Sequence, residues 1–314
     1  ISVNVVSTNE YATNNYGKVE YFYKVKDTSF NDLGIYVYSK DTRGENGLSI
    51  NDMKYWCDLD FQSTERTTFW GETDSSNFRI YFPPNYNFKN KYNAIICFHG
   101  NGTDETQWSL NDNMLHVKNK LIENNYIVLT CSYKNSKTTW GNKYSTQAYY
   151  EAYKYLIDNF SNIDNIGIYC NSMGGIESLN FISENRLKPK CWVGTVPTYD
   201  LDANYSSESG SDFSGIIRSA YEIQSDGSDY TKKTNGRNPA KMPNYLFSAI
   251  PMLCIGATGD VTVSPTDNIE KLYNDLYPVC NITKVIYNGG NHSDFDLANN
   301  LNKIVDFYTK NMNK

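Results

Sequence analysis

Short apolar runs alternate with longer amphipathic stretches from Phe78 onward, and this alternation constrains the fold more than any other feature. The apolar runs fall at 78–82, 94–99, 126–131, 166–170, 191–196, 251–255 and 284–287. Helix-like segments lie between them, at about 112–124, 145–160, 173–184, 265–276 and 295–312. Such alternation is typical of a mostly parallel β-sheet with helices on both faces. In such a sheet, functional side chains gather at the carboxyl ends of the strands.

The rest of the 314-residue chain has a different pattern. Apolar and polar residues alternate at a period of about two over Val19–Val25 and Leu33–Ser39, with no helical pattern between them. We therefore expect residues 1–75 to form a small β-rich region, either an extension of the main sheet or a separate attachment module. The α/β domain is expected over 76–314, with an irregular segment at about 201–250 that forms a lid or cap.

Charge and hydropathy exclude two classes of partner. The chain has 29 Lys and Arg against 35 Asp and Glu, a net charge of -6, and no basic block, so we expect no nucleic-acid partner. Its apolar runs are far shorter than the roughly 18 residues of a spanning helix, so we expect no membrane span. The 7 Cys include no CxxC pair and no Cys/His cluster, which predicts neither a zinc site nor a disulfide framework.

A serine stands at one strand-to-helix junction, in the sequence Tyr169-Cys170-Asn171-Ser172-Met173-Gly174-Gly175. A nucleophilic serine on such a tight turn needs very small residues two positions away on each side, because the backbone folds back on itself. Gly174 meets this need on one side, and Cys170 stands where glycine is usual on the other. The motif therefore indicates a nucleophile at Ser172, and a glycine-bearing junction with an incidental serine is the alternative.

An earlier strand ends in a glycine-containing loop, His99-Gly100-Asn101-Gly102-Thr103. Glycines let a backbone approach another group closely. A loop of this kind offers backbone N–H groups beside a nucleophile, where a negatively charged oxygen would form. Taken alone the motif fits an ordinary turn equally well, but its position two strands before Ser172 favours the functional interpretation.

An acid and a base candidate follow two later strands. Asp260 comes directly after the apolar run at 251–255, and His292 lies between the last short strand and the last helix. The order Ser, Asp, His along the chain, each at the end of a strand, is one of the known orders of a catalytic triad. Asp200 and Asp202, which follow the run at 191–196, are the reserve candidates for the acid.

The other two histidines have different positions. His99 belongs to the glycine-containing loop, and His116 falls within a helical pattern on a solvated face. His292 is therefore the only histidine placed to serve Ser172. No metal and no cofactor is required by this chemistry, and the phosphate-cradling pattern Gly-x-x-x-x-Gly-Lys-Ser/Thr is absent from the sequence.

These motifs resemble the α/β-hydrolase superfamily, and more narrowly its esterase branch of feruloyl- and acetyl-esterase-like and polyhydroxybutyrate-depolymerase-like enzymes. The strand and prolines at 78–86 resemble the opening strand of that branch, and the resemblance covers about residues 76–314. It implies that Ser172 is the nucleophile, His292 the general base and then acid, and Asp260 the residue that orients the histidine.

The resemblance also implies an oxyanion hole. It would be built from the backbone N–H group of Met173 and from that of Asn101 or Gly102. The reaction that follows is hydrolysis of a carboxylic ester through an acyl-enzyme.

Aromatic residues suggest the substrate. Trp140 follows the strand at 126–131 and Tyr199 follows the run at 191–196, so both are expected to border the cleft or its lid. Exposed aromatic rings suit the apolar faces of sugars. In a chain with 27 Tyr a core or surface position is the alternative. With the resemblance, the pattern favours an O-acetyl or aryl ester on a polysaccharide.

Two other functions stay open at this point. A serine peptidase of the same fold uses the same triad, and a glycan-binding or structural module could retain the fold without turnover. The start at Ile1 and the β-rich region suggest one part of a larger polypeptide or assembly. We therefore expect an extracellular or virion-associated location rather than a cytoplasmic one.

Overall fold

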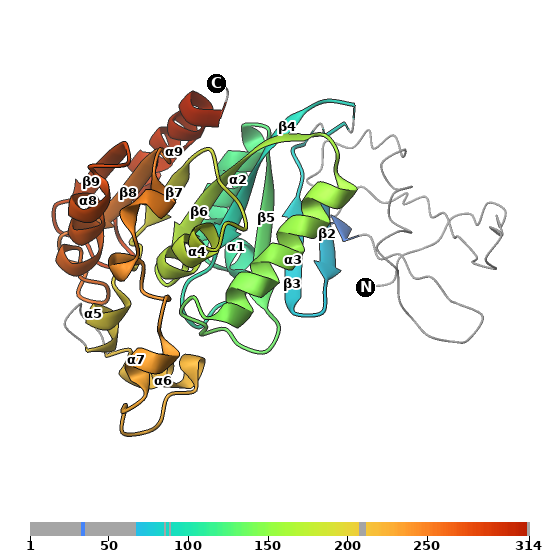
Figure 1. Cartoon of the computed structure of the whole chain (residues 1–314). Helices are drawn as coiled ribbons and strands as arrows, with labels where there is room; N and C mark the ends of the chain where they lie inside the picture. Colours follow the sequence, from blue (N-terminus) through green and yellow to red (C-terminus); the bar gives the residue numbers. More distant parts are fainter. Residues whose placement is uncertain (1–32, 35–66, 85, 88, 207–211, 313–314) are drawn as a thin grey trace, which may run out of the picture.

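The computed structural model describes residues 33–34, 67–84, 86–87, 89–206 and 212–312. Their strands form one sheet in the order β1-β2-β3-β5-β4-β6-β7-β8-β9 (Figure 1). The strand bounds are Leu33–Gly34 (β1), Thr67–Glu72 (β2), Ser76–Tyr81 (β3), Tyr92–Phe98 (β4), Tyr126–Tyr133 (β5), Ile163–Asn171 (β6), Trp192–Thr195 (β7), Met252–Ala257 (β8) and Ile282–Tyr287 (β9). Each apolar run of the sequence from Phe78 onward corresponds to one of β3–β9.

Helices alternate with the strands from β4 onward. Their bounds are Gln107–Leu110 (α1), Asp112–Glu123 (α2), Lys143–Asn159 (α3), Gly174–Ser183 (α4), Lys271–Leu276 (α8, preceded by the π-helical turn η4 at Thr266–Glu270) and Leu297–Met312 (α9). The side chains of Asn111 and Asn142 accept hydrogen bonds from N–H groups in the first turns of α2 and α3. Those N–H groups have no partner within the helix, so the two asparagines stabilise the points where α2 and α3 begin.

The sheet is parallel from β5 across to β9, and antiparallel where β3 meets β5 and where β2 meets β3. Because β4 lies between β5 and β6, the chain first moves one way across the sheet and then returns past β4 in the other direction. The connections on the two sides of β4 therefore lie on opposite faces. A crevice at the carboxyl ends of the strands is expected at such a switch point.

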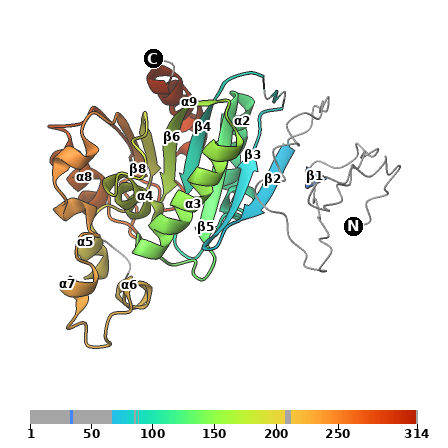
Figure 2. The same ribbon diagram turned by 45° about the vertical axis from the view of Figure 1, so that its right-hand side comes forward.

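Apolar side chains cover both faces of the sheet. One cluster contains Tyr149 of α3, Leu179 of α4 and Leu272 of α8, and the other contains Val117 of α2 and Tyr308 of α9, all of them buried against strand residues. Figures 1 and 2 show α3 and α4 on one side of the sheet and α9 on the other. The predicted fold class, a mostly parallel sheet with helices on both faces, is confirmed.

The sheet begins earlier than the expected boundary at residue 76. β2 starts at Thr67 and pairs with β3 in a register that places Trp70 opposite Arg79. β1 in turn pairs with β2 in parallel. The main sheet thus extends into the 1–75 region, while most of that region lies outside the described residues. A separate attachment module there stays a prediction.

The segment between β7 and β8 forms short helices. They are Leu201–Tyr205 (α5), Ser214–Tyr221 (α6), Tyr230–Lys233 (α7) and the 3-10 turns Pro239–Lys241 (η2) and Asn244–Phe247 (η3). In Figure 1, α5, α6 and α7 gather at the end of the molecule away from α9. Ile217 and Tyr221 of α6 are buried in one apolar cluster with Met173 and Ile176, at the start of α4. α6 therefore packs beside the residue that follows Ser172.

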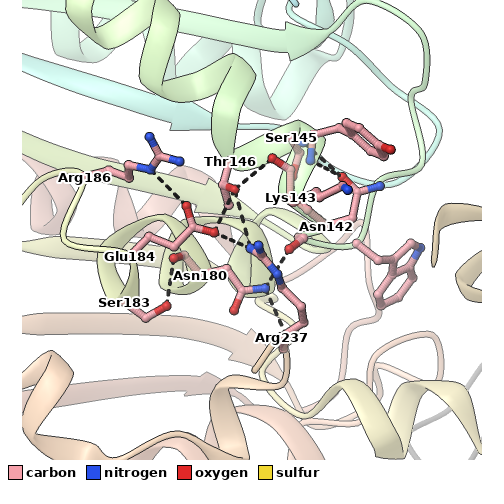
Figure 3. A network of polar contacts seen from close by, with 12 residues as sticks. Asn142, Lys143, Ser145, Thr146, Asn180, Ser183, Glu184, Arg186 and Arg237 are labelled. Atoms are coloured by element: carbon pink, nitrogen blue, oxygen red, sulfur yellow. Dashed lines mark hydrogen bonds and ion pairs between the residues drawn. The ribbon is translucent and has the colours of Figure 1, made fainter. Parts of the chain in front are cut away.

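Polar contacts anchor the chain where it returns from this segment (Figure 3). Arg237 pairs with Glu184, which ends α4. Glu184 also accepts a hydrogen bond from Thr146 Oγ1 of α3 at 3.0 Å and pairs with Arg186 at 3.0 Å. The return from α7 toward β8 is thus held against the two helices that cover the sheet.

Two further observations concern membrane-spanning helices and the cysteines. Across the described ranges, none of the helices is both long enough and apolar enough to cross a membrane. The six cysteines that the structure describes are buried free thiols, which agrees with their packing as small hydrophobic residues. Burial raises the pKa of both Cys191 and Cys254 to about 12, so these thiols stay protonated at neutral pH.

Candidate active site

Ser172, Asp260 and His292 meet at the carboxyl ends of the strands. They follow β6, β8 and β9 respectively. His292 Nε2 lies 2.9 Å from Ser172 Oγ, and His292 Nδ1 lies 2.8 Å from Asp260 Oδ2. The structure thus brings together the serine, the histidine and the acid that the sequence predicts, in the geometry of a triad.

Asp260 is held by the backbone that follows it. Its Oδ1 accepts hydrogen bonds from the N–H groups of Thr262 and Val263, both at 2.9 Å, and the side chain is 2% exposed. These bonds direct the second carboxylate oxygen toward His292. Since a carboxylate only accepts, chemistry assigns the imidazole proton to Nδ1, which leaves Nε2 free to accept the proton of Ser172 Oγ.

Ser172 occupies a strained turn between β6 and α4. Its φ of +52° lies in the left-handed region, which is uncommon for a residue with a side chain. Glycines make the turn possible: a Cβ at Gly174 would lie 2.4 Å from Phe98 O, and one at Gly175 would lie 2.2 Å from Thr198 O. Thr198 also donates to Ser172 O from its N–H at 2.9 Å and from Oγ1 at 3.0 Å. The chain is therefore fixed on both sides of the serine hydroxyl.

The loop that carries His292 is fixed by its own turn. Asn291 Oδ1 accepts from the N–H groups of Ser293 at 2.8 Å and Asp294 at 3.0 Å, and Asn291 N–H donates to Asp294 O at 2.8 Å. Gly290 has a φ of +66°, and a Cβ there would lie 2.1 Å from Asp294 O. Only glycine fits this position, so the turn sets where the imidazole stands.

The glycine-containing loop after β4 lies directly against the serine. A Cβ built on Gly100 would be 3.6 Å from Ser172 Cβ. Most N–H groups of this loop are already engaged: that of His99 donates to Tyr149 Oη at 3.2 Å, and that of Gly100 donates to Gln107 Oε1 at 2.9 Å. These contacts hold the loop in place but remove both groups as donors to a substrate.

The structure distinguishes between the two predicted oxyanion donors of the loop. Gly102 N–H donates to Lys137 O at 3.0 Å, so the expectation that Gly102 offers a free donor is wrong. Among the described residues, the N–H groups of Asn101 and Met173 donate to no protein acceptor. Met173 follows Ser172 and Asn101 is next to Gly100, so two unoccupied donors remain beside the hydroxyl.

The two aromatic residues expected to bind substrate are buried. Trp140 and Tyr199 each have 0% exposure. Tyr199 belongs to the cluster on the α3 face, and its N–H donates to Asn268 Oδ1 at 2.8 Å. Trp140 Nε1 donates to Asn101 Oδ1 at 3.1 Å. The prediction that these rings contact a sugar is therefore corrected. Tyr199 is part of the core, and Trp140 contacts the loop after β4.

The reserve acids have structural contacts. Asp200 Oδ1 accepts from Asp202 N at 3.0 Å and from Asn238 Nδ2 at 2.8 Å, where it begins α5. Asp202 Oδ1 accepts from Tyr230 Oη at 2.7 Å, and its other oxygen pairs with Lys241. Both carboxylates thus hold the segment between β7 and β8 together. Of the three candidate acids, all of which the structure describes, only Asp260 is hydrogen-bonded to His292.

Sequence reasoning missed Glu177. This side chain is fully buried one turn into α4, and it accepts a hydrogen bond from the hydroxyl of Thr139. Burial raises the pKa of the Glu177 carboxyl to about 8, so it is mostly protonated at neutral pH. The signal in the sequence was a lone acid within the apolar helix pattern that follows Ser172.

In the part of the chain that the structure describes, the other two histidines make no hydrogen bond to Ser172 or Asp260. His99 is buried, which lowers the pKa of its imidazole, and its Nδ1 lies 2.9 Å from Gly100 O. His116 is exposed on α2, as its helical pattern predicted. Over the described residues, no group of three or more His, Cys, Asp or Glu side chains is arranged to hold a metal ion.

Comparison with known proteins finds likeness in structure. No family model and no curated protein matches this chain. The Pyrococcus furiosus esterase Pf2001 is similar with a TM-score of 0.57 at 15% identity, over 85% of this chain and 94% of the esterase. A truncated carbohydrate esterase from gut microbiota has a TM-score of 0.57 at 16% identity, over 76% of this chain and 91% of its own.

A peptidase has a comparable likeness. The puromycin-hydrolysing peptidase of Mycobacterium tuberculosis has a TM-score of 0.61 at 16% identity. It matches 97% of this chain, which spans 53% of the peptidase. Identities this low establish a shared architecture and leave the chemistry to the site itself. The sheet order, the helices on both faces and the likeness to these hydrolases together show that the chain has the α/β-hydrolase fold.

Proposed function

We propose that the protein is a serine esterase that hydrolyses a carboxylic ester through an acyl-enzyme. The observation that carries this proposal is the hydrogen-bonded series from Asp260 Oδ2 through both imidazole nitrogens of His292 to Ser172 Oγ, with distances of 2.8 and 2.9 Å. A serine hydroxyl is a weak nucleophile until a neighbouring base accepts its proton. The arrangement supplies that base and the carboxylate that orients it.

The first half of the reaction uses the triad in one direction. Ser172 Oγ attacks the ester carbonyl carbon while its proton passes to His292 Nε2, and the Asp260 carboxylate stabilises the imidazolium that results. The imidazolium then gives this proton to the leaving alcohol oxygen as the ester C–O bond breaks. Water attacks the acyl-enzyme with the same proton transfers, which releases the acid and restores the serine.

The oxyanion formed in each step needs donors that are in place beforehand. The N–H groups of Met173 and Asn101 fit this role because neither is used by a protein acceptor in the described residues. Met173 also immediately precedes α4, whose amino end carries partial positive charge. One such donor typically contributes on the order of 10²–10³ in rate.

The substrate we propose is an ester on a carbohydrate, an O-acetyl or aryl ester. With Trp140 and Tyr199 buried, the support for this choice is the sequence resemblance and the carbohydrate esterase among the structural likenesses. Hydrolysis of acetylated and feruloylated polysaccharides, measured as released acetate or ferulate, tests it. The expected extracellular or virion-associated location stays a prediction.

A serine peptidase is the second candidate, because a peptidase matches nearly the whole chain. Turnover of an aryl acetate compared with a peptide anilide separates the two. An esterase of the proposed kind hydrolyses the acetate and leaves the anilide essentially intact, and the reverse preference would favour the peptidase.

Labelling with a fluorophosphonate probe tests the nucleophile itself. We expect one adduct, which peptide mass mapping places on Ser172, and no adduct on the Ser172→Ala variant. Absence of an adduct on the folded wild-type protein would contradict the proposed function and favour a binding module without turnover.

A further inference from the structure

Trp140 has an unusual backbone for so large a residue. Its φ is +47°, and its side chain is 0% exposed. A bulky residue in the left-handed region persists only where its surroundings determine it, and such residues gather at functional sites. Ser172 shares this property, with a φ of +52°. The structure therefore raises the question of what the strained conformation of Trp140 positions.

The neighbours of Trp140 are held individually by α4 and α3. The Thr139 hydroxyl donates a hydrogen bond to the Glu177 carboxyl of α4. Asn180 of α4 donates from Nδ2 to Gly141 O at 2.9 Å. The side chain of Asn142 caps the first turn of α3 (Figure 3). These contacts fix the chain on both sides of Trp140 and so account for its φ.

Trp140 contacts both residues whose N–H groups are the proposed oxyanion donors. Its Nε1 donates to Asn101 Oδ1 at 3.1 Å, and its backbone N donates to Met173 Sδ at 3.4 Å. The contact with Asn101 is the more important for holding a donor, since Asn101 lies in a loop. Among the described residues, its side chain makes no other hydrogen bond. The indole thus holds the side chain of the residue whose N–H is the loop donor.

The opposite side of Trp140 contacts α6. Tyr221, the last residue of that helix, donates from Oη to Trp140 O at 2.7 Å, and the Phe213 ring lies 4.8 Å from the indole between centroids. Asn142 Nδ2 adds a hydrogen bond to Ala220 O at 2.8 Å. The buried residue Trp140 thus connects α6 to the loop after β4, which lies beside Ser172.

We propose that Trp140 is a positioning residue that couples α6 to the oxyanion hole. This inference rests on the proposed function. The indole holds Asn101 so that its N–H points at the developing oxyanion, and α6 holds the indole. A substrate that contacts α6 would thereby act on the rate of the chemical step as well as on binding.

The test compares five variants, four single and one double, with the wild type on an aryl acetate. Trp140→Phe keeps a buried ring and removes the indole N–H, and Asn101→Ala removes the acceptor while keeping the backbone N–H. We expect each to lower kcat by about 10- to 100-fold with KM changed less than about threefold. The reason is that a displaced donor stabilises the transition state less, while substrate binding is little affected. The double variant should be no slower than the slower single one, since both remove the same contact.

Trp192→Phe is the matched control. Trp192 is equally buried on β7, and its Nε1 donates to Ser178 Oγ at 2.9 Å. Replacement of Trp192 removes a similar indole hydrogen bond, but one that does not involve the loop after β4. We expect a lower Tm with kcat within about twofold of the wild type, which separates general destabilisation from positioning.

Tyr221→Phe tests the α6 side of the coupling. Removal of the hydroxyl should lower kcat by about three- to tenfold, again with little change in KM. It also provides a second measurement if Trp140→Phe does not fold. An unchanged kcat in Tyr221→Phe would overturn the coupling to α6.

The outcomes separate this inference from the proposed function. Folded Trp140→Phe or Asn101→Ala with wild-type kcat would overturn the positioning role while leaving an active esterase. A wild-type protein that neither hydrolyses esters nor reacts with the fluorophosphonate would instead contradict the proposed function itself.

Discussion

The Glu177 carboxyl accepts a hydrogen bond from the Thr139 hydroxyl in the buried space between α4 and the turn that holds Trp140. An acid in this position is neutral in the folded protein at neutral pH, because burial raises its pKa from the ordinary value of 4.5 to about 8. In the unfolded chain the same carboxyl ionises at its ordinary value. The two states therefore bind different numbers of protons over the interval between these pH values.

This difference predicts a stability that falls with rising pH. Between about 4.5 and 8 the folded state keeps a proton that the unfolded state has lost, so unfolding free energy decreases by up to about 1.4 kcal/mol per pH unit from this group. Glu177→Gln keeps the shape and the acceptor without the titration. Urea unfolding of both proteins at several pH values should show a shallower dependence in the variant, and parallel curves would contradict the assignment.

Replacement of the triad acid should affect turnover far more than stability. Asp260→Asn keeps the acceptor for Thr262 and Val263 but offers an amide in place of the carboxylate oxygen that orients His292. We expect kcat to fall on the order of 10⁴-fold. Asp200→Asn is the control, because an amide oxygen can also accept at the start of α5, and its kcat should stay within about twofold. A fall of less than tenfold in Asp260→Asn would argue against the triad.

Gly174→Ala should damage both the fold and the site. The added Cβ would lie 2.4 Å from Phe98 O, at the end of the strand that leads into the loop after β4. Either strand or helix must shift, which we expect to cost about 1–3 kcal/mol in unfolding free energy and to lower kcat at least about tenfold. Gly215→Ala is the comparison, since its Cβ meets only Arg218 Nη2 at 3.9 Å. Thermal unfolding and aryl acetate turnover of the pair measure both effects, and equal behaviour would refute the packing argument.

Activity should fall in acid because the proposed base must be unprotonated. A protonated His292 cannot accept the proton of Ser172, so kcat/KM should decrease as the pH is lowered. Glu177→Gln should leave this profile in place, since Glu177 contacts neither residue. A profile that stays flat from mildly acidic to neutral pH would argue against histidine as the base.

The sequence predicted the sheet and the meeting of three polar side chains at its edge because both depend on local pattern. Apolar runs of strand length alternate with amphipathic segments, and each proposed catalytic residue lies in the loop after a strand. Parallel strands therefore bring Ser172, Asp260 and His292 to one edge of the sheet. Cys170 departed from the usual glycine, and it is buried in the sheet core at the end of β6. A thiol is small enough for that position.

The errors concern contacts between residues distant in the chain. Whether Gly102 or Asn101 offers a donor depends on Lys137, whose carbonyl oxygen is reached only through the folded loop. The burial of Trp140 likewise depends on α6, which follows it by more than seventy residues. No local pattern distinguishes an aromatic residue that lines a cleft from one that supports its wall.

The extension of the sheet to Thr67 has a practical consequence for anyone who shortens this chain. A truncated protein that starts at residue 76, where the sequence pattern changes, would lose β2 and leave β3 as the outermost strand. Its unpaired N–H and C=O groups would then be open to a strand from another molecule, which favours aggregation. A start before Thr67 keeps β3 covered by its natural neighbour, so soluble yield should depend on these nine residues.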